Sequence, residues 1–134
     1  RNYQRTLEDY SDYVEIARNA GAGETLDRII PEIYNEAMFP GTAMLYSFPS
    51  YVYSLWQEYS VEELEYIASF CKEKGIPAAT VYWEYWSEET EKIFEKNGIS
   101  LYVYTVNDRD QARRYISQGA EGICTDFLTA EDLW

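Results

Sequence analysis

Histidine is absent from this sequence of 134 residues. Its ordinary pKa lies close to neutral pH, and it is the most frequent proton donor and acceptor in enzymes. The sequence therefore excludes catalysis by histidine within this chain. A pair of carboxylates is the alternative, and Glu32, Glu84 and Asp126 lie at or near the ends of expected strands, but no sequence signal pairs them. We assign no catalytic residue.

Cysteine is also scarce. Cys71 and Cys124 are too few for a disulfide framework, and without CxxC spacing or a histidine they do not indicate a metal site. Cys71 lies in a helical pattern and Cys124 in a short strand pattern. We expect both thiols to pack in the core.

The sequence also lacks long apolar runs, and it has few basic residues compared with acidic ones. No run of about 18 apolar residues is present, so the sequence predicts no membrane span, and it contains no signal-peptide pattern. Eleven basic residues stand against 24 acidic ones, which gives a formal net charge of -13. Such a charge repels a nucleic-acid backbone or an anionic membrane, so we expect neither as a partner.

The length and the hydrophobic fraction of 46% allow one core, and we expect residues 1–134 to form a single domain. The clearest helix runs over 61–74, because Ser60 and Glu63 form a capping box before it and Gly75 ends it. Gly75, Gly98 and Gly119 each follow a helical pattern, and they recur about every 22 residues, as expected for βα units of a parallel sheet.

Five strands are expected, and helices alternate with them. Pro31 is an obstacle within the first strand, because proline lacks the N–H that a ladder needs. The expected helices cover 6–20, 61–74, a stretch from Ser87 to about residue 97, and a stretch capped by Asn107 or Asp108 that ends near 117. The expected strands lie near 29–34, 51–56, 78–83, 100–105 and 122–124.

Four segments resemble the glycerophosphodiester phosphodiesterase family. Residues 30–34 (Ile-Pro-Glu-Ile-Tyr) are similar to the family's Ile-Pro-Gln-Ile-Tyr, and 51–56 are similar to the apolar strand that follows it. Residues 104–107 (Tyr-Thr-Val-Asn) resemble Trp-Thr-Val-Asn, and 122–126 match the closing Gly-Ile-x-Thr-Asp. The matches occur in family order over about residues 28–127.

The resemblance implies an α/β fold, a partial (β/α)₈ TIM-type barrel of about five parallel strands with outer helices. Complete barrels of this type have about 250 residues, so the chain corresponds to the C-terminal five βα units. The family's His-Arg-Gly and Glu-Asn-Thr motifs are not present. The resemblance also implies a divalent cation (Ca or Mg) for the complete barrel and a small glycerophosphodiester as its substrate.

Five residues are candidates for substrate binding. The resemblance implies that Asn107 and Thr125 lie where a phosphate binds, although each is equally suited to cap a helix. Tyr104 and Trp83 are aromatic residues at strand ends, where they stack on a substrate or fill the interior. Glu32 replaces the family's glutamine and adds negative charge next to the expected phosphate.

Two hypotheses for function follow. The chain is either part of a phosphoric diester hydrolase that needs a missing N-terminal barrel segment for activity, or a catalytically silent barrel-derived module for binding or assembly. Aromatic residues make up 17% of the chain, and an incomplete barrel exposes strand edges, so we also expect self-association if that segment is absent. An unrelated α/β domain is the remaining alternative.

Overall fold

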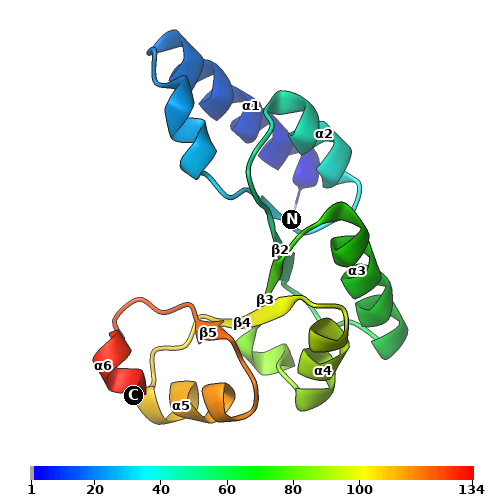
Figure 1. The fold of residues 1–134 in the computed structure, drawn as a ribbon, viewed down its shortest axis with the longest axis vertical. Helices are drawn as coiled ribbons and strands as arrows, with labels where there is room; N and C mark the ends of the chain where they lie inside the picture. Colours follow the sequence, from blue (N-terminus) through cyan, green and yellow to red (C-terminus); the bar gives the residue numbers. More distant parts are fainter. Residues whose placement is uncertain (1) are drawn as a thin grey trace. The chain divides into compact units, whose positions relative to one another are not determined.

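A computed structural model of the protein describes residues 2–134, and five strands form one sheet in the order β1-β2-β3-β4-β5 (Figure 1). The α/β sheet expected from the sequence is thereby confirmed. The chain divides into two compact units, up to Val52 and from Tyr53 onward. The elements are α1 (Tyr3–Asn19), η1 (Gly23–Arg28), β1 (Glu32–Ile33), α2 (Met38–Leu45), β2 (Val52–Leu55), α3 (Val61–Lys74), β3 (Ala78–Tyr82), η2 (Trp83–Tyr85), α4 (Glu88–Lys96), β4 (Ser100–Tyr104), α5 (Arg109–Ser117), β5 (Gly122–Ile123) and α6 (Ala130–Leu133).

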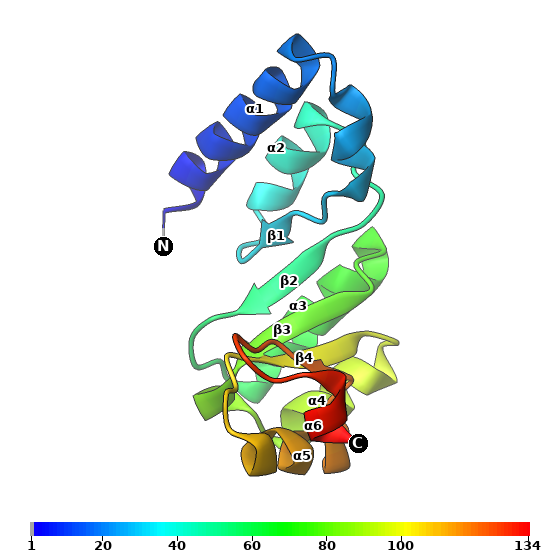
Figure 2. The same ribbon diagram turned by 90° about the vertical axis from the view of Figure 1, so that its left-hand side faces the viewer.

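In the first unit, helices α1 and α2 pack against each other (Figure 2). Gly41 of α2 permits the close approach, because a Cβ atom there would lie 3.1 Å from Leu7 Cδ1 of α1. The Tyr10 hydroxyl of α1 donates to the carbonyl oxygen of Glu32 at 2.7 Å. Helix α1 therefore holds α2 through packing and the backbone of β1 through a hydrogen bond.

Strand β1 is shorter than the expected strand over 29–34. Ile29 and Ile30 are exposed and lie outside it. Pro31 has no N–H to donate, and its carbonyl oxygen instead accepts from the Val52 N–H at 3.1 Å. The prediction was correct in place and wrong in length, because proline limits the ladder.

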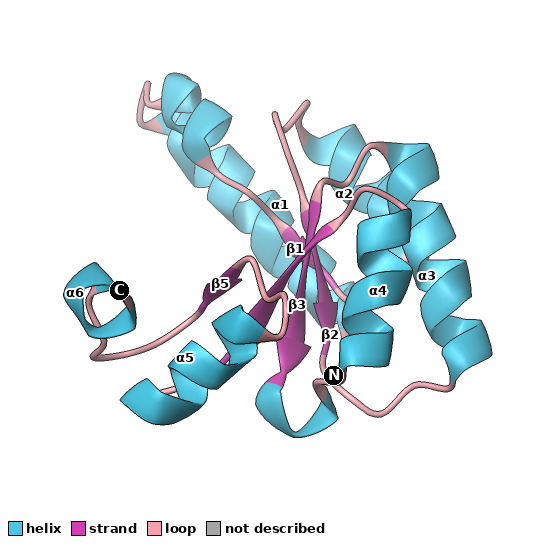
Figure 3. Ribbon diagram, turned by 60° about the horizontal axis from the view of Figure 1, so that its bottom comes forward, coloured by secondary structure: helices cyan, strands magenta, loops and turns pink. Residues whose placement is uncertain are grey.

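The second unit is organised by the parallel pair β3 and β4. Ala79 pairs with Leu101 and Val81 with Val103, and all four side chains are buried. Helices α3 and α4 pack against each other, and α4 also contacts β4 (Figure 3). Because side chains alternate along a strand, burial of this set directs Thr80, Tyr82, Tyr102 and Tyr104 to the opposite face.

Local signals set the helix boundaries as expected. The Ser60 side chain accepts from the Glu63 N–H at 3.2 Å, and the Glu63 carboxylate accepts from the Ser60 N–H at 2.7 Å. Gly75 ends α3 with φ 69°, and Gly98 and Gly119 also have positive φ after their helices. These observations confirm the repeating βα unit.

Three further expectations need correction. Cys71 is buried as predicted, but Cys124 is exposed because it follows the two-residue strand β5 at the edge of the described sheet. Strand β3 ends at Tyr82, and Trp83 begins a short 3₁₀ turn. Helix α1 begins three residues earlier than expected, with Asn2 as its N-cap.

Within residues 2–134, no helix is long and apolar enough to cross a membrane.

Replacement of Ser60 by alanine tests the capping box. The loss of its side-chain acceptor leaves the Glu63 N–H without its partner, so we expect the free energy of unfolding to fall by about 1 kcal/mol. Urea denaturation followed by circular dichroism measures this change. Ser69→Ala is the matched control, because Ser69 is exposed within the same helix and alanine is the better helix former there. Equal effects of the two substitutions would contradict the assignment.

Replacement of Gly122 by alanine tests the packing between β4 and β5. An added Cβ atom would lie 2.8 Å from Tyr102 Cε1, so the ring must move, and we expect a loss of about 1–3 kcal/mol in urea denaturation. The control is Gly23→Ala, where an added Cβ atom meets nothing within 4 Å. We expect Tyr102→Ala to relieve the clash when it is combined with Gly122→Ala, and strict additivity of the two substitutions would argue against this contact.

Candidate functional site

The candidate site lies at the carboxyl ends of β4 and β5, in the second unit. The Cys124 N–H donates to the Val103 carbonyl oxygen at 2.8 Å, and the Val106 N–H donates to the Cys124 carbonyl oxygen at 3.0 Å. These bonds extend the pairing beyond the two strands. They bring the segment after β4, which contains Asn107, beside the segment after β5, which contains Thr125.

Asn107 joins the two segments through its side chain. Its Oδ1 atom accepts from the Thr125 hydroxyl and from the Asp126 N–H, each at 2.9 Å. Its Nδ2 atom donates to Asp126 Oδ2 at 2.9 Å. The structure therefore brings two predicted site residues, Asn107 and Thr125, into direct contact. We refer to Asn107, Thr125 and Asp126 as the amide clamp.

Asn107 and Thr125 were each considered as a possible helix cap, but neither caps a helix. The side chain of Asp108, and not that of Asn107, accepts from the Gln111 N–H at the start of α5. Thr129 caps α6, and the Asp132 carboxylate accepts from its N–H and hydroxyl, which lowers the pKa of Asp132. Asn107 and Thr125 are thus available to shape the loops between strands and helices.

Aromatic side chains form a second cluster at the carboxyl end of β3. The ring of Tyr82 contacts the rings of Trp83, Tyr85 and Tyr104, with centroids 5.7, 5.8 and 5.7 Å apart. Two predicted residues, Trp83 and Tyr104, therefore share one neighbour. We call these four residues the aromatic platform. The sequence analysis did not select Tyr82, although its register partner is Tyr104.

Polar groups of the platform are available for a ligand. Within the part of the chain that the structure describes, the hydroxyls of Tyr82 and Tyr104 and the indole N–H of Trp83 make no hydrogen bond, while 37% of the Trp83 surface is exposed. Such groups donate hydrogen bonds without adding charge. The platform is therefore suited to contact both the apolar and the hydroxyl-bearing parts of a small polar molecule.

Glu32, the remaining predicted residue, belongs to β1 of the first unit, where its carbonyl oxygen binds the Tyr10 hydroxyl. Among residues 2–134, no group of three His, Cys, Asp or Glu side chains is arranged to hold a metal ion.

Three solved structures resemble the chain. A Silicibacter pomeroyi protein assigned as a glycerophosphoryl diester phosphodiesterase has TM-score 0.67 and 16% identity, over 95% of this chain and 43% of its own. A glycerophosphodiester phosphodiesterase from Parabacteroides distasonis has TM-score 0.62 and 18% identity, over 94% and 49%. An Oleispira antarctica phosphodiesterase, solved with sn-glycerol-3-phosphate, has TM-score 0.56 and 12% identity, over 76% and 37%.

These likenesses confirm the expected fold class, a part of a (β/α)₈ barrel, and the chain spans less than half the length of each neighbour. A comparison with curated proteins gives no significant match. The sequence model of the glycerophosphoryl diester phosphodiesterase family matches residues 42–130, which include the amide clamp and the aromatic platform. Since this match extends over more than half of the residues, the chain belongs to the glycerophosphoryl diester phosphodiesterase family.

Proposed function

We propose that this chain is the C-terminal portion of a phosphoric diester hydrolase that converts a glycerophosphodiester to glycerol phosphate and an alcohol. The observation that carries the proposal is the family match over residues 42–130. The amide clamp and the aromatic platform lie within this match, at the carboxyl ends of β3, β4 and β5. In barrels of this type, active sites gather at that end of the strands.

The chemistry explains why we propose that the chain is inactive alone. Hydrolysis of a phosphodiester needs an activated oxygen nucleophile, a proton donor to the leaving alkoxide and positive charge at the phosphoryl oxygens. The chain has no histidine for the first two tasks. We infer that the N-terminal segment of the barrel supplies these groups and the ligands of the divalent cation, which provides the positive charge when it is bound.

The chain would contribute substrate contacts. The hydroxyls of Tyr82 and Tyr104 lie on adjacent strands at one face of the sheet, where they serve as neutral donors to the glycerol or phosphate oxygens. Trp83 and Tyr104 provide ring surface for the carbon atoms. Asn107 uses its amide within the clamp, so we assign it a positioning role, with Thr125 held at the rim of the site. Glu32 would disfavour a phosphate close to it.

A catalytically silent module for binding or assembly is the second candidate. It is favoured by the absence of histidine and by large apolar side chains at the surface, of which Phe127 is 75% and Trp134 is 80% exposed. Such side chains favour association with another surface. In this alternative the chain pairs with itself or another protein and no hydrolysis follows.

Complementation separates the two candidates. The chain is co-expressed with the part of a related barrel that it does not match, namely the part of the Silicibacter pomeroyi protein that lies outside the matched 43%. We expect release of glycerol phosphate from glycerophosphodiesters in the presence of Ca²⁺ or Mg²⁺, and no release by either half alone. Hydrolysis by this chain alone would contradict the proposed division of labour. A folded complex of both halves without activity would support the silent module.

Replacement of Asn107 by alanine tests the clamp. The substitution removes both acceptor bonds and the donor bond, and we expect about 1–2 kcal/mol of local stabilisation to be lost at this exposed position. Hydrogen exchange at the Asp126 N–H should accelerate by about tenfold or more. Asn19→Ala, at the exposed end of α1, is the control and should leave that exchange rate unchanged. Unaltered exchange in Asn107→Ala would show that the clamp does not hold the loop.

A further inference from the structure

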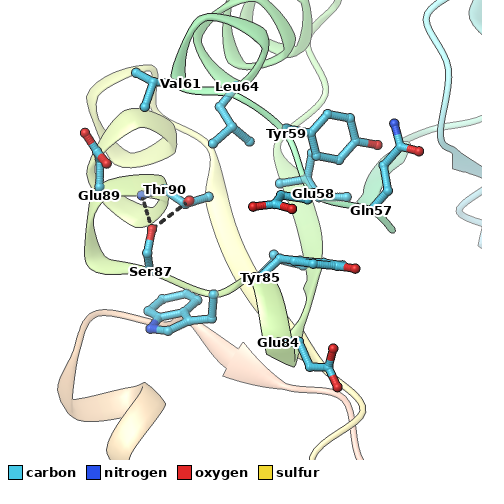
Figure 4. A pocket seen from close by; sticks show the side chains of 13 residues that line it. Gln57, Glu58, Tyr59, Val61, Leu64, Glu84, Tyr85, Ser87, Glu89 and Thr90 are labelled. Atoms are coloured by element: carbon cyan, nitrogen blue, oxygen red, sulfur yellow. Dashed lines mark hydrogen bonds between the residues drawn. The ribbon is translucent and has the colours of Figure 1, made fainter.

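A pocket of about 250 Å³ opens at the carboxyl ends of β2 and β3, entirely within the second unit. It is lined by the ends of these strands and by the segments that lead into α3 and α4 (Figure 4). Pockets for drug-sized ligands commonly enclose ~300–1,000 Å³. This pocket is therefore suited to one small chemical group.

The floor of the pocket is apolar. It consists of Leu55 from β2, Leu64 from α3 and Val81 from β3, all of which are buried. Thr90 also lines the pocket, and its hydroxyl and N–H are both bonded to Ser87 Oγ, at 2.9 and 3.0 Å. The floor therefore favours alkyl groups over a strongly hydrated anion.

Aromatic side chains form the walls. Tyr59, Tyr85 and Trp86 line the pocket, and two of them are held by neighbours outside it. The Trp86 indole N–H donates to Gln118 Oε1 at 2.9 Å, and the Tyr85 ring packs against Tyr82. These contacts fix the rings before a ligand arrives, which reduces the entropy lost on binding.

The charges that line the pocket are all negative. They belong to Glu58, Glu84 and Glu89, and no lysine or arginine lines the pocket. Across residues 2–134, none of these three carboxylates takes part in an ion pair or a side-chain hydrogen bond. In Figure 4, the carboxylate of Glu58 lies between Tyr59 and Tyr85, whereas Glu84 points away. Glu58 is therefore the charge most directly placed to meet a ligand.

The helix N-termini nearby do not reverse this preference. Helices α3 and α4 begin beside the pocket, and such termini attract anions through their exposed N–H groups. Here the Glu63 and Thr90 N–H groups are bonded to the serine caps, and Glu62, Glu63, Glu88 and Glu89 occupy the first turns. The negative side chains therefore repel phosphate from this pocket.

We propose that this pocket binds an alkylammonium group, held against Tyr59, Tyr85 and Trp86 and neutralised by Glu58. Aromatic faces attract organic cations, and an apolar floor accepts their alkyl substituents. The pocket's preference for such a cation stands independently of catalysis. The further idea that the pocket receives the head group of a diester substrate rests on the proposed function. In that case the head group lies at β2 and β3, and the phosphate lies toward β4 and β5.

Titration of the isolated chain with choline chloride tests the pocket, with 3,3-dimethylbutan-1-ol as the neutral probe of the same shape. We expect chemical shift changes at Tyr59, Tyr85 and Trp86 with choline and weaker binding of the neutral alcohol and of inorganic phosphate. Glu58→Gln should weaken choline binding about two- to fivefold, or ~0.5–1 kcal/mol. Glu121→Gln, an exposed site outside the pocket, should leave it unchanged. Equal binding of choline and the alcohol, or no binding by the folded chain, would overturn the proposal.

The complemented barrel distinguishes a head group from a free ammonium ligand. If the head group enters the pocket, Glu58→Gln lowers kcat/KM for a diester with a choline head group about two- to fivefold more than it lowers kcat/KM for a diester with an uncharged glycerol head group. Choline binding with no such selectivity would support the pocket and overturn its role in the substrate. Choline binding by a complemented barrel that hydrolyses neither diester would overturn the proposed function while the pocket stands.

Discussion

The parallel pairing of β3 with β4 is the constraint on which the second unit depends. Its register places Ala79 beside Leu101 and Val81 beside Val103, and burial of this face fixes which residues face the other way. A slip by one residue would send the tyrosines into the helix layer and the aliphatic residues out of it. The same pairing therefore forms the core and collects Tyr82 and Tyr104 at one end of the opposite face. The buried core and the candidate binding surface therefore both follow from the alternation of side chains between the two faces of β3 and β4.

Beyond the ends of the strands, side-chain hydrogen bonds hold neighbouring segments together in place of the backbone ladder. Beyond β4 and β5 the backbone ladder persists only through Val106 and Cys124, and the Asn107 amide then replaces backbone groups as donor and acceptor. An amide suits this position because it satisfies a hydroxyl, an N–H and a carboxylate at the same time. The loops at this edge are thus positioned by the sheet, which is the condition for a site whose residues come from separate βα units.

The sequence predicted best what is decided locally. The boundaries of α3 follow from Ser60, Glu63 and Gly75, all within one turn of the helix ends. The length of β1 was predicted less well, because Ile29 and Ile30 have strand-forming side chains but Pro31 cannot continue the ladder. The clamp was not predictable in detail, since Asn107 is an equally good helix cap until its tertiary partners are known. The prediction that Cys124 is buried was also wrong because of tertiary structure, since the exposure of a residue after a short edge strand depends on what lies beside that strand.

Net charge constrains how this chain can bind the substrate that we propose. With a formal charge of -13, its long-range field opposes any phosphate, so the contacts that favour one must be short-range and neutral. The tyrosine hydroxyls and the indole N–H of the platform meet that requirement without the cost of burying a cation. The same acidity becomes favourable at β2 and β3, where Glu58 stands between aromatic rings. The two proposals together imply one orientation for a zwitterionic substrate, with its positive end at the acidic pocket and its phosphate toward β4 and β5.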